Sequence, residues 1–382
     1  MRRWRLYLVL VVVLLLAFHI GGGWYFSDQL RADALVISRE EESLDLLVTE
    51  VGGGTVGLRP LEGEDDDLTD PSVLGLEWAT GYGQLFDIVR ENDDGSVVRR
   101  MVRIDGQLPS VGELADAEGF AYPPDPQRAF GLFYDEVTFT SPLGEMTAWE
   151  ILSGSGPWVI HVHGLGASRS EALRLVGPIA SAGFSQLVIS YRNDDGLPAD
   201  PSGFYQYGRT EWEDVAGAVD YVVGKGADQV ILVGYSTGAA HVMSYLLQRP
   251  TDPVVGVIFD SPNLDFERAV DLGASQRRLP FIGLPLPPSL VWTAKRISTL
   301  RFGIAWSEVD YVTRAGELTV PVQIFHGSED DTVPLEVSSD LVAARPDLVR
   351  LVIVPGAGHV RSWNVGAEAY ERRLLAFLEE IR

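Results

Sequence analysis

A serine stands between two glycines, directly after an apolar run, in the segment LVGYSTGAAH (232–241). A serine hydroxyl becomes a nucleophile only when a base removes its proton, so Ser236 needs a histidine within reach. The pattern G-x-S-x-G is weak evidence in a chain with 40 glycines. Its context is more specific, because QVILVGY reads as a strand and TGAAHVMSYLLQ as a helix. A nucleophile on such a turn requires neighbours with very small side chains, and Gly234 and Gly238 meet this requirement. The alternative is that Ser236 is a structural residue of a tight turn.

One of the six histidines occupies the place that a catalytic base needs. His359, in VPGAGHVRSW, follows the last predicted strand and precedes the final predicted helix, so its loop can bring an imidazole to Ser236. The other five lie where core, loop-shaping or membrane positions are expected: His19, His161, His163, His241 and His326.

The base in turn needs a carboxylate that fixes its tautomer and stabilises its charged form. The segment IFHGSEDDTVP offers Asp330 after the penultimate predicted strand. The order Ser, Asp, His at successive strand ends favours Asp330. Asp331 and Asp260 remain alternatives, since Asp331 is adjacent and Asp260 ends the strand VVGVIFD.

Negative charge on a reacting carbonyl oxygen requires two hydrogen-bond donors. The backbone N–H of Thr237, directly after the nucleophile, is one candidate. Leu165 is the second, because Gly164 and Gly166 leave the backbone exposed around it in the loop HVHGLGASRS, which His163 is also expected to shape. No G-x-x-x-x-G-K-[ST] or G-x-G-x-x-G pattern occurs, so a nucleotide site is unsupported. Serine chemistry of this kind implies no metal or organic cofactor.

These residues need a scaffold, and the second half of the chain predicts one. Six strand-length runs rich in Val, Ile and Leu alternate with helical patterns between residues 158 and 356. Such alternation predicts an α/β fold with a mostly parallel, doubly wound sheet, in which chemistry collects at the carboxyl ends of the strands. The clearest helix is TEWEDVAGAVDYVVGKG, for which Thr210 and Glu213 predict a capping box.

The first 26 residues, MRRWRLYLVLVVVLLLAFHIGGGWYF, predict a transmembrane signal anchor. The apolar stretch is long enough to cross a bilayer, and the arginines before it predict a cytoplasmic N-terminus and an extracytoplasmic remainder. Secretion after cleavage of a signal peptide is the alternative, although no Ala-x-Ala site follows.

The remaining regions are less specific. Residues 27–130 predict a small β-rich, membrane-proximal region that ends in the proline-rich linker AYPPDPQRAF, or a partly ordered spacer. Residues 131–382 form the predicted catalytic domain. They contain an insertion at about 262–310, which the family resemblance given below implies to be a lid over the site. Its apolar side chains are candidates for an acyl pocket or for packing alone: Phe281, Leu284, Leu286, Trp292 and Phe302.

Composition limits the partners. The net charge of −24 argues against nucleic acid, whose phosphates would be repelled. The absence of cysteine excludes disulfides and a thiol nucleophile. Neither feature specifies an oligomeric state.

The segments HVHGLGASR, GYSTGAA, HGSEDDTVP and GAGHV, in this order, resemble the α/β-hydrolase superfamily from about residue 132 to the end. SPLGEMTAW, YRNDDG, TEWEDV and SWN are similar to a membrane-anchored or secreted bacterial branch near the serine aminopeptidase-like (Bem46-like) hydrolases. The resemblance implies a nucleophile elbow at Ser236, an acid at Asp330, a base at His359, and oxyanion donors at Leu165 and Thr237. Gly238-Ala239 departs from the two glycines usual in peptidase members.

The sequence therefore predicts a serine hydrolase that cleaves small-molecule or lipid carboxylic esters or thioesters through an acyl-enzyme, outside the cytoplasmic membrane. A peptidase or an acyltransferase on the same machinery is the first alternative. A non-catalytic anchored binding protein is the second.

Overall fold

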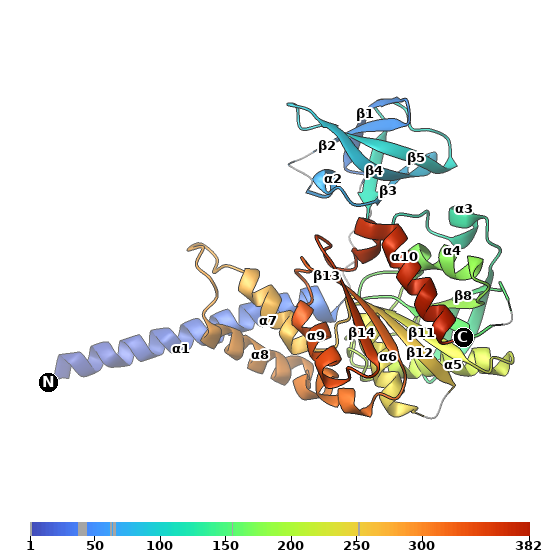
Figure 1. The fold of residues 1–382 in the computed structure, drawn as a ribbon. Helices are drawn as coiled ribbons and strands as arrows, with labels where there is room; N and C mark the ends of the chain where they lie inside the picture. Colours follow the sequence, from blue (N-terminus) through green and yellow to red (C-terminus); the bar gives the residue numbers. More distant parts are fainter. Residues whose placement is uncertain (1, 37–43, 62, 64–65, 155, 251–252) are drawn as a thin grey trace.

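The computed structural model describes residues 2–36, 44–61, 63, 66–154, 156–250 and 253–382. A long N-terminal helix, a small β-barrel and a larger α/β domain follow one another along the chain (Figure 1). The helix projects away from the α/β domain, and the barrel lies beside the first turn of the last helix.

The N-terminal helix α1 (Arg2–Leu30) continues into a short π-helical stretch, η1 (Arg31–Leu35). It is long and apolar enough to cross a membrane, with a mean hydropathy of 2.4. Its side chains are exposed from Trp4 to Phe18. The boundary expected at residue 26 is too early, because the helix runs on until Leu35 is buried in the core of the α/β domain.

Residues expected to be β-rich form a closed antiparallel barrel with the strand order β1-β2-β5-β4-β3-β6. Its interior is apolar, and Trp78 and Leu85 are among the side chains that fill it. The strands are β1 (Leu46–Gly52), β2 (Thr55–Pro60), β3 (Leu74–Trp78), β4 (Gly81–Glu91), β5 (Val97–Gly106) and β6 (Leu114–Glu118), with α2 (Asp66–Thr69) after β2. In the predicted linker, α3 (Pro126–Phe130) is a short helix capped by the Asp125 side chain.

The α/β domain contains an eight-stranded sheet in the order β14-β13-β12-β11-β9-β10-β8-β7. β9 to β14 are parallel, β8 pairs antiparallel with β10, and the edge strand β7 pairs antiparallel with β8, so the predicted mostly parallel sheet is confirmed. The strands are β7 (Asp135–Ser141), β8 (Gly144–Ile151), β9 (Trp158–Val162), β10 (Gln186–Ile189), β11 (Val230–Tyr235), β12 (Val254–Asp260), β13 (Val322–Gly327) and β14 (Val349–Val354).

Helices cover both faces of this sheet. One core lies under α4 (Leu173–Ser181) and α10 (Ser362–Glu380), and the short η2 (Arg169–Ala172) leads into α4. The other core lies under α5 (Trp212–Gly224), α6 (Thr237–Gln248) and α9 (Leu335–Ala344). This double cover explains why the strands read as continuous apolar runs.

The predicted lid is the insertion between β12 and β13. It contains α7 (Phe266–Gln276) and α8 (Pro288–Phe302), followed by the 3₁₀ turns η3 (Trp306–Glu308) and η4 (Val312–Glu317). The loop between α7 and α8 and the start of α8 lie alongside α1 and project with it from the domain (Figure 1).

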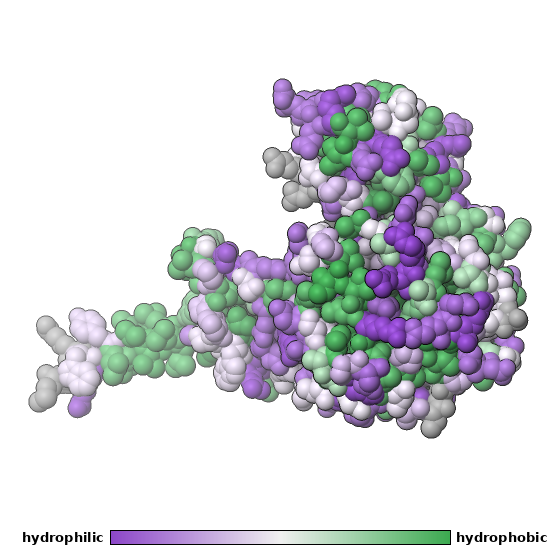
Figure 2. Space-filling model, in the orientation of Figure 1, coloured by the Kyte–Doolittle hydropathy of each residue, from purple (hydrophilic) through white to green (hydrophobic). Residues whose placement is uncertain are grey.

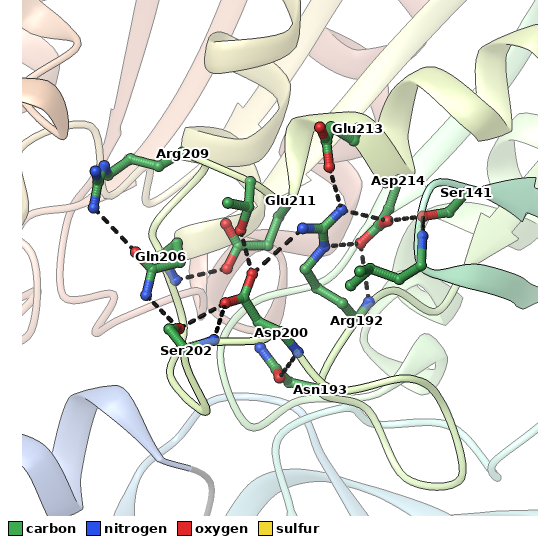
Figure 3. Close-up of polar contacts among 12 residues, drawn as sticks. Ser141, Arg192, Asn193, Asp200, Ser202, Gln206, Arg209, Glu211, Glu213 and Asp214 are labelled. Carbon is green, nitrogen blue, oxygen red and sulfur yellow. Dashed lines mark hydrogen bonds and ion pairs between the residues drawn. The ribbon is translucent and has the colours of Figure 1, made fainter. Parts of the chain in front are cut away.

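A buried polar network fixes the loop between β10 and α5 (Figure 3). Arg192 lies 2.7 Å from Asp214 and 3.4 Å from Asp200. The predicted capping box is wrong: Thr210 donates to Asp200, Glu213 pairs with Arg192, and no side chain caps α5.

The same loop fastens the end of η1. The backbone N–H of Tyr205 donates to the Leu35 carbonyl at 3.0 Å, and the Tyr207 hydroxyl donates to the Ala34 carbonyl at 2.7 Å. The last turn of the N-terminal helical segment is therefore built into the α/β domain.

Candidate active site

Ser236 occupies a strained turn between β11 and α6. Its φ of 47° and ψ of −115° are rare for a residue with a side chain and cost about 1–3 kcal/mol. A Cβ at Gly234 would lie 2.6 Å from the Ala239 Cα, and one at Gly238 would lie 2.1 Å from the Val162 carbonyl oxygen. The two glycines are therefore required by the close approach of α6 to the sheet.

The loop after β14 brings His359 to this serine. Nε2 of His359 lies 2.8 Å from Oγ of Ser236, and Nδ1 lies 2.8 Å from Oδ2 of Asp330. The His359 side chain is 21% exposed, so the imidazole faces accessible space. With Nδ1 donating to Asp330, Nε2 is free to accept the serine proton.

Asp330 is held as an anion. Burial alone would raise the pKa of Asp330, but hydrogen bonds from His326 and His359 and the charge of His359 hold it well below its usual value. The backbone N–H of Val333 donates to Oδ1 at 2.8 Å, and Nε2 of His326 lies 3.2 Å from Oδ2. A carboxylate that remains ionised can orient and stabilise the imidazole over a wide pH range.

The two alternative acids have other partners. The Asp331 side chain is exposed and accepts from the Thr332 hydroxyl at 3.2 Å. Asp260 is buried, and its Oδ2 accepts from the Tyr370 hydroxyl at 3.1 Å. Burial raises the pKa of Asp260 to about 6. Of the three candidate acids, Asp330 is the one that is hydrogen-bonded to His359.

The two expected oxyanion donors, Leu165 and Thr237, both line the cavity in front of Ser236. Thr237 is the first residue of α6, so its N–H precedes the first intrahelical acceptor and is available to a ligand. Gly164 is fixed because its N–H donates to the Glu171 carboxylate at 2.7 Å. His163, expected to shape this loop, is buried and bonds to the Gly164 carbonyl and to Asp194.

A buried pair that the sequence did not indicate braces the loops that carry Gly164 and His359. Glu171 holds Gly164, and Arg174, 4.0 Å from Glu171, donates to the carbonyl of Val360, the residue after His359. Arg174 also donates to Asn364, whose amide donates to backbone carbonyls of Val73 in the barrel and Gly119. No local pattern marks Glu171 or Arg174, because the contacts join segments far apart in the chain.

The remaining histidines serve structural positions. Burial lowers the pKa of His161 to about 4 and that of His241 to about 3, so both are neutral near pH 7. His19 lies 2.9 Å from the hydroxyl of Ser289 on α8. His326 contacts the Ser338 hydroxyl at 2.7 Å and Asp330, so it positions the acid in addition to shaping its loop.

A cavity of about 440 Å³ opens in front of Ser236 and His359. Its walls are mainly apolar and come from the end of α1 and η1, from the lid, and from the loops that follow β9, β10, β11, β13 and β14. Of the five lid side chains expected near an acyl chain, only Leu286 lines it. Phe281, Leu284 and Trp292 are exposed, and Phe302 packs against Phe204.

The contribution of α1 and η1 to this cavity was not expected from the sequence. Phe26, Leu30 and Ala34 lie one helical turn apart and present one apolar face to it. Among the described residues, no group of three or more histidine or acidic side chains is placed to hold a metal ion.

Comparisons with known proteins agree with this architecture. A family model described as "Alpha/beta hydrolase family" matches residues 159–373, which is more than half of the chain. An uncharacterised protein of Mycobacterium tuberculosis is 29% identical over 208 residues, which are 54% of this chain and 64% of that protein. The match thus covers slightly less than two thirds of that relative's length.

Two further proteins are similar over the same domain. The bifunctional esterase/perhydrolase of Acinetobacter calcoaceticus is 26% identical over 202 residues, covering 44% of this chain and 72% of that protein. An esterase of Pyrococcus furiosus superposes with a TM-score of 0.53 at 18% identity, covering 68% of this chain and 97% of the esterase. The structural likeness supports the fold.

Proposed function

The chain belongs to the alpha/beta hydrolase family, and from that premise we propose that it is a serine hydrolase cleaving carboxylic esters or thioesters through an acyl-enzyme. The observation that carries the proposal is a chain of hydrogen bonds between three side chains. Oγ of Ser236 lies 2.8 Å from Nε2 of His359, and Nδ1 of His359 lies 2.8 Å from Oδ2 of Asp330. Ser236 and His359 line an apolar cavity. The esterase/perhydrolase similarity supports an ester as the substrate class.

In the first half-reaction, Nε2 of His359 takes the hydroxyl proton as Oγ of Ser236 forms a bond to the substrate carbonyl carbon. The carbonyl π electrons move to its oxygen, and the N–H groups of Leu165 and Thr237 stabilise the resulting anion. Collapse of this intermediate expels the alcohol or thiol, which takes its proton from Nε2. Asp330 stays ionised and stabilises the imidazolium.

In the second half-reaction, water replaces the departed alcohol. His359 takes a proton from the water as its oxygen attacks the acyl carbonyl, and the returning proton releases Ser236 with a free carboxylic acid. One ester bond and one water O–H bond are broken, and one carboxylic acid and one alcohol are formed.

The proposal places the catalytic domain outside the cytoplasmic membrane, with α1 as an uncleaved anchor. The exposed apolar surface of α1 and the arginines at its N-terminus support this orientation. The fit of α1 against α8 supports retention of the helix, because Gly22 and Gly23 allow contacts with Leu290, Thr293 and Ile297. Membership of the membrane-anchored, Bem46-like branch is part of the same proposal.

A fluorophosphonate probe tests the nucleophile directly. We expect the full-length protein in detergent to be labelled, and Ser236→Ala to lose both labelling and hydrolysis of p-nitrophenyl butyrate. Equal labelling of the two proteins would contradict the role of Ser236. A folded wild-type protein that neither reacts nor hydrolyses would support the non-catalytic binding alternative.

The bond that is cleaved and the molecule that accepts the acyl group distinguish an esterase from a peptidase and an acyltransferase. Parallel assays with p-nitrophenyl esters, aminoacyl anilides and an added alcohol distinguish an esterase, a peptidase and an acyltransferase. We expect ester hydrolysis to be faster than anilide hydrolysis. An acyl product on the alcohol in place of free acid would indicate a transferase.

A further inference from the structure

The end of the N-terminal helical segment is a wall of the active-site cavity. Phe26 and Leu30 of α1 and Ala34 of η1 line the same space as Ser236 and His359. The segment is fixed there, since Leu35 is 2% exposed and the carbonyls of Ala34 and Leu35 accept hydrogen bonds from the β10–α5 loop. The cavity therefore extends from the nucleophile to the apolar surface of α1.

The lid is attached to α1 at the depth where a bilayer would end. A span of about 20 residues crosses about 30 Å of hydrocarbon, and counting from Leu6 it ends near Tyr25. Gly23 of α1 contacts α8 at Thr293 and Ile297, and one turn further on, the hydroxyls of Ser27 and Ser298 are 3.0 Å apart. The middle of α8 therefore lies at the edge of the hydrocarbon layer, and its first turn, where Ser289 contacts His19, lies within it.

The lid loop carries the surface that such a position requires. Phe281 is fully exposed, and Ile282 and Leu284 are 62% and 59% exposed. Hydrophobic colour covers α1 and the projecting lid loop beside it (Figure 2). Exposed apolar side chains at the tip of a projecting loop indicate contact with an apolar partner.

The charge of the lid segment 277–302 is opposite to that of the whole chain. Residues 277–302 contain five Lys and Arg and no Asp or Glu, in a chain with 30 basic and 54 acidic residues. Arg278 and Arg296 are exposed on this segment. Basic residues beside exposed apolar side chains fit a membrane surface with anionic headgroups.

We propose that the lid inserts its 279–286 loop into the outer leaflet, and that the substrate is a membrane-resident amphiphile whose acyl chain passes from the bilayer into the cavity. The chain lies against Phe26, Leu30 and Leu286, and its ester carbonyl reaches Ser236. This substrate class rests on the proposed hydrolase function, whereas contact between the lid and the bilayer does not.

Two ester substrates, one that partitions into the bilayer and one that stays in water, test whether the acyl chain enters the cavity from the bilayer. Full-length protein is reconstituted in vesicles with anionic lipid and assayed with 4-methylumbelliferyl palmitate in the bilayer and with the soluble butyrate ester. An aspartate at the lid tip opposes insertion, so for Phe281→Asp we expect the palmitate-to-butyrate rate ratio to fall about tenfold. Phe133→Asp is the matched control, because Phe133 is 87% exposed before the edge strand β7, and we expect its ratio to stay within about twofold. An unchanged ratio for Phe281→Asp would overturn the proposal.

A spectroscopic measurement tests lid insertion without activity. The chain has no cysteine, so Phe281→Cys and Phe133→Cys can each carry one environment-sensitive fluorophore. We expect a blue-shifted emission, quenched by nitroxide lipids, at position 281 only. An active enzyme whose dye at 281 stays in water would overturn this inference and leave the hydrolase proposal standing. A dye buried in lipid on a protein without esterase activity would refute the hydrolase proposal and the substrate class with it.

Discussion

Nε2 of His359 lies 2.8 Å from Oγ of Ser236, although 123 positions separate the two residues in the sequence. The contact depends on two turns with positive φ, at Ser236 and at Val360, directly after the histidine. The turn at Ser236 is possible because Gly234 and Gly238 leave room for the close approach of α6. The turn at Val360 is held by a hydrogen bond from Arg174 to the Val360 carbonyl. Ser236 and His359 are therefore already within hydrogen-bond distance, and the proposed proton transfer would require no movement of the backbone.

Asp330→Asn should lower kcat about 10⁴-fold, because an amide favours the wrong tautomer of His359 and cannot stabilise its positive charge. Asp331→Asn is the matched control, since Asp331 is the exposed neighbour, and its loss should stay below about tenfold. Hydrolysis of p-nitrophenyl butyrate measures both, with circular dichroism as the check on folding. A larger loss for Asp331→Asn would identify that residue as the acid.

Asp260→Asn should change stability with pH and leave the hydrolytic machinery in place. Burial raises the pKa of Asp260 from 3.8 to about 6, so the folded state binds its proton more tightly than the unfolded chain does. At pH 4 and below, the buried carboxyl is protonated in the folded state and does not destabilise it. Above pH 6 the buried carboxylate lowers the free energy of unfolding by on the order of 2–3 kcal/mol. The amide still accepts from Tyr370, so the variant should melt at a higher temperature than wild type at pH 8.

Thermal unfolding of both proteins at pH 4 and pH 8 measures this effect. The two melting temperatures should converge at pH 4, where the wild-type carboxyl is protonated. A gain of equal size at both pH values would show that the effect comes from packing and not from titration.

The sequence was sufficient to predict that the candidate residues lie together where their placement depends on the order of strands and helices. Ser236 follows a strand, His359 precedes the last helix, and parallel strands place their carboxyl ends at one edge of the sheet. The predicted mostly parallel sheet is confirmed, since the strand runs are apolar along their whole length.

Features that depend on long-range contacts were not predictable. The closed barrel requires pairing between β1 and β6, whose register the alternating pattern alone does not determine. The cavity wall at Phe26 and Leu30 requires α1 to fit between the lid and the β10–α5 loop. The capping box at Thr210 was wrong for the same reason, because Asp200 and Arg192 compete for its side chains.

Gly238→Ala should destabilise the α/β domain. The new Cβ would lie 2.1 Å from the Val162 carbonyl oxygen, so β9 and α6 must separate, at a cost of about 3 kcal/mol or more. Gly273→Ala in α7 is the control, because nothing lies within 4 Å of its Cβ position. Alanine there should stabilise the helix by about 1 kcal/mol. Equal melting temperatures for the two variants would contradict the close approach at Gly238.

Gly23→Val should weaken the contact between α1 and α8, because its Cβ would lie 2.9 Å from both Thr293 and Ile297. Gly21→Val is the matched control on the same helix, since no atom lies within 4 Å of its Cβ position. Ser27→Cys with Ser298→Cys provides the readout in this cysteine-free chain, because the two hydroxyls are 3.0 Å apart. Oxidation should form the disulfide readily in the Gly21→Val background and several-fold more slowly in the Gly23→Val background. Equal rates of disulfide formation would mean that α1 and α8 do not need close packing, and the helix would then be a tether and not a wall of the active site.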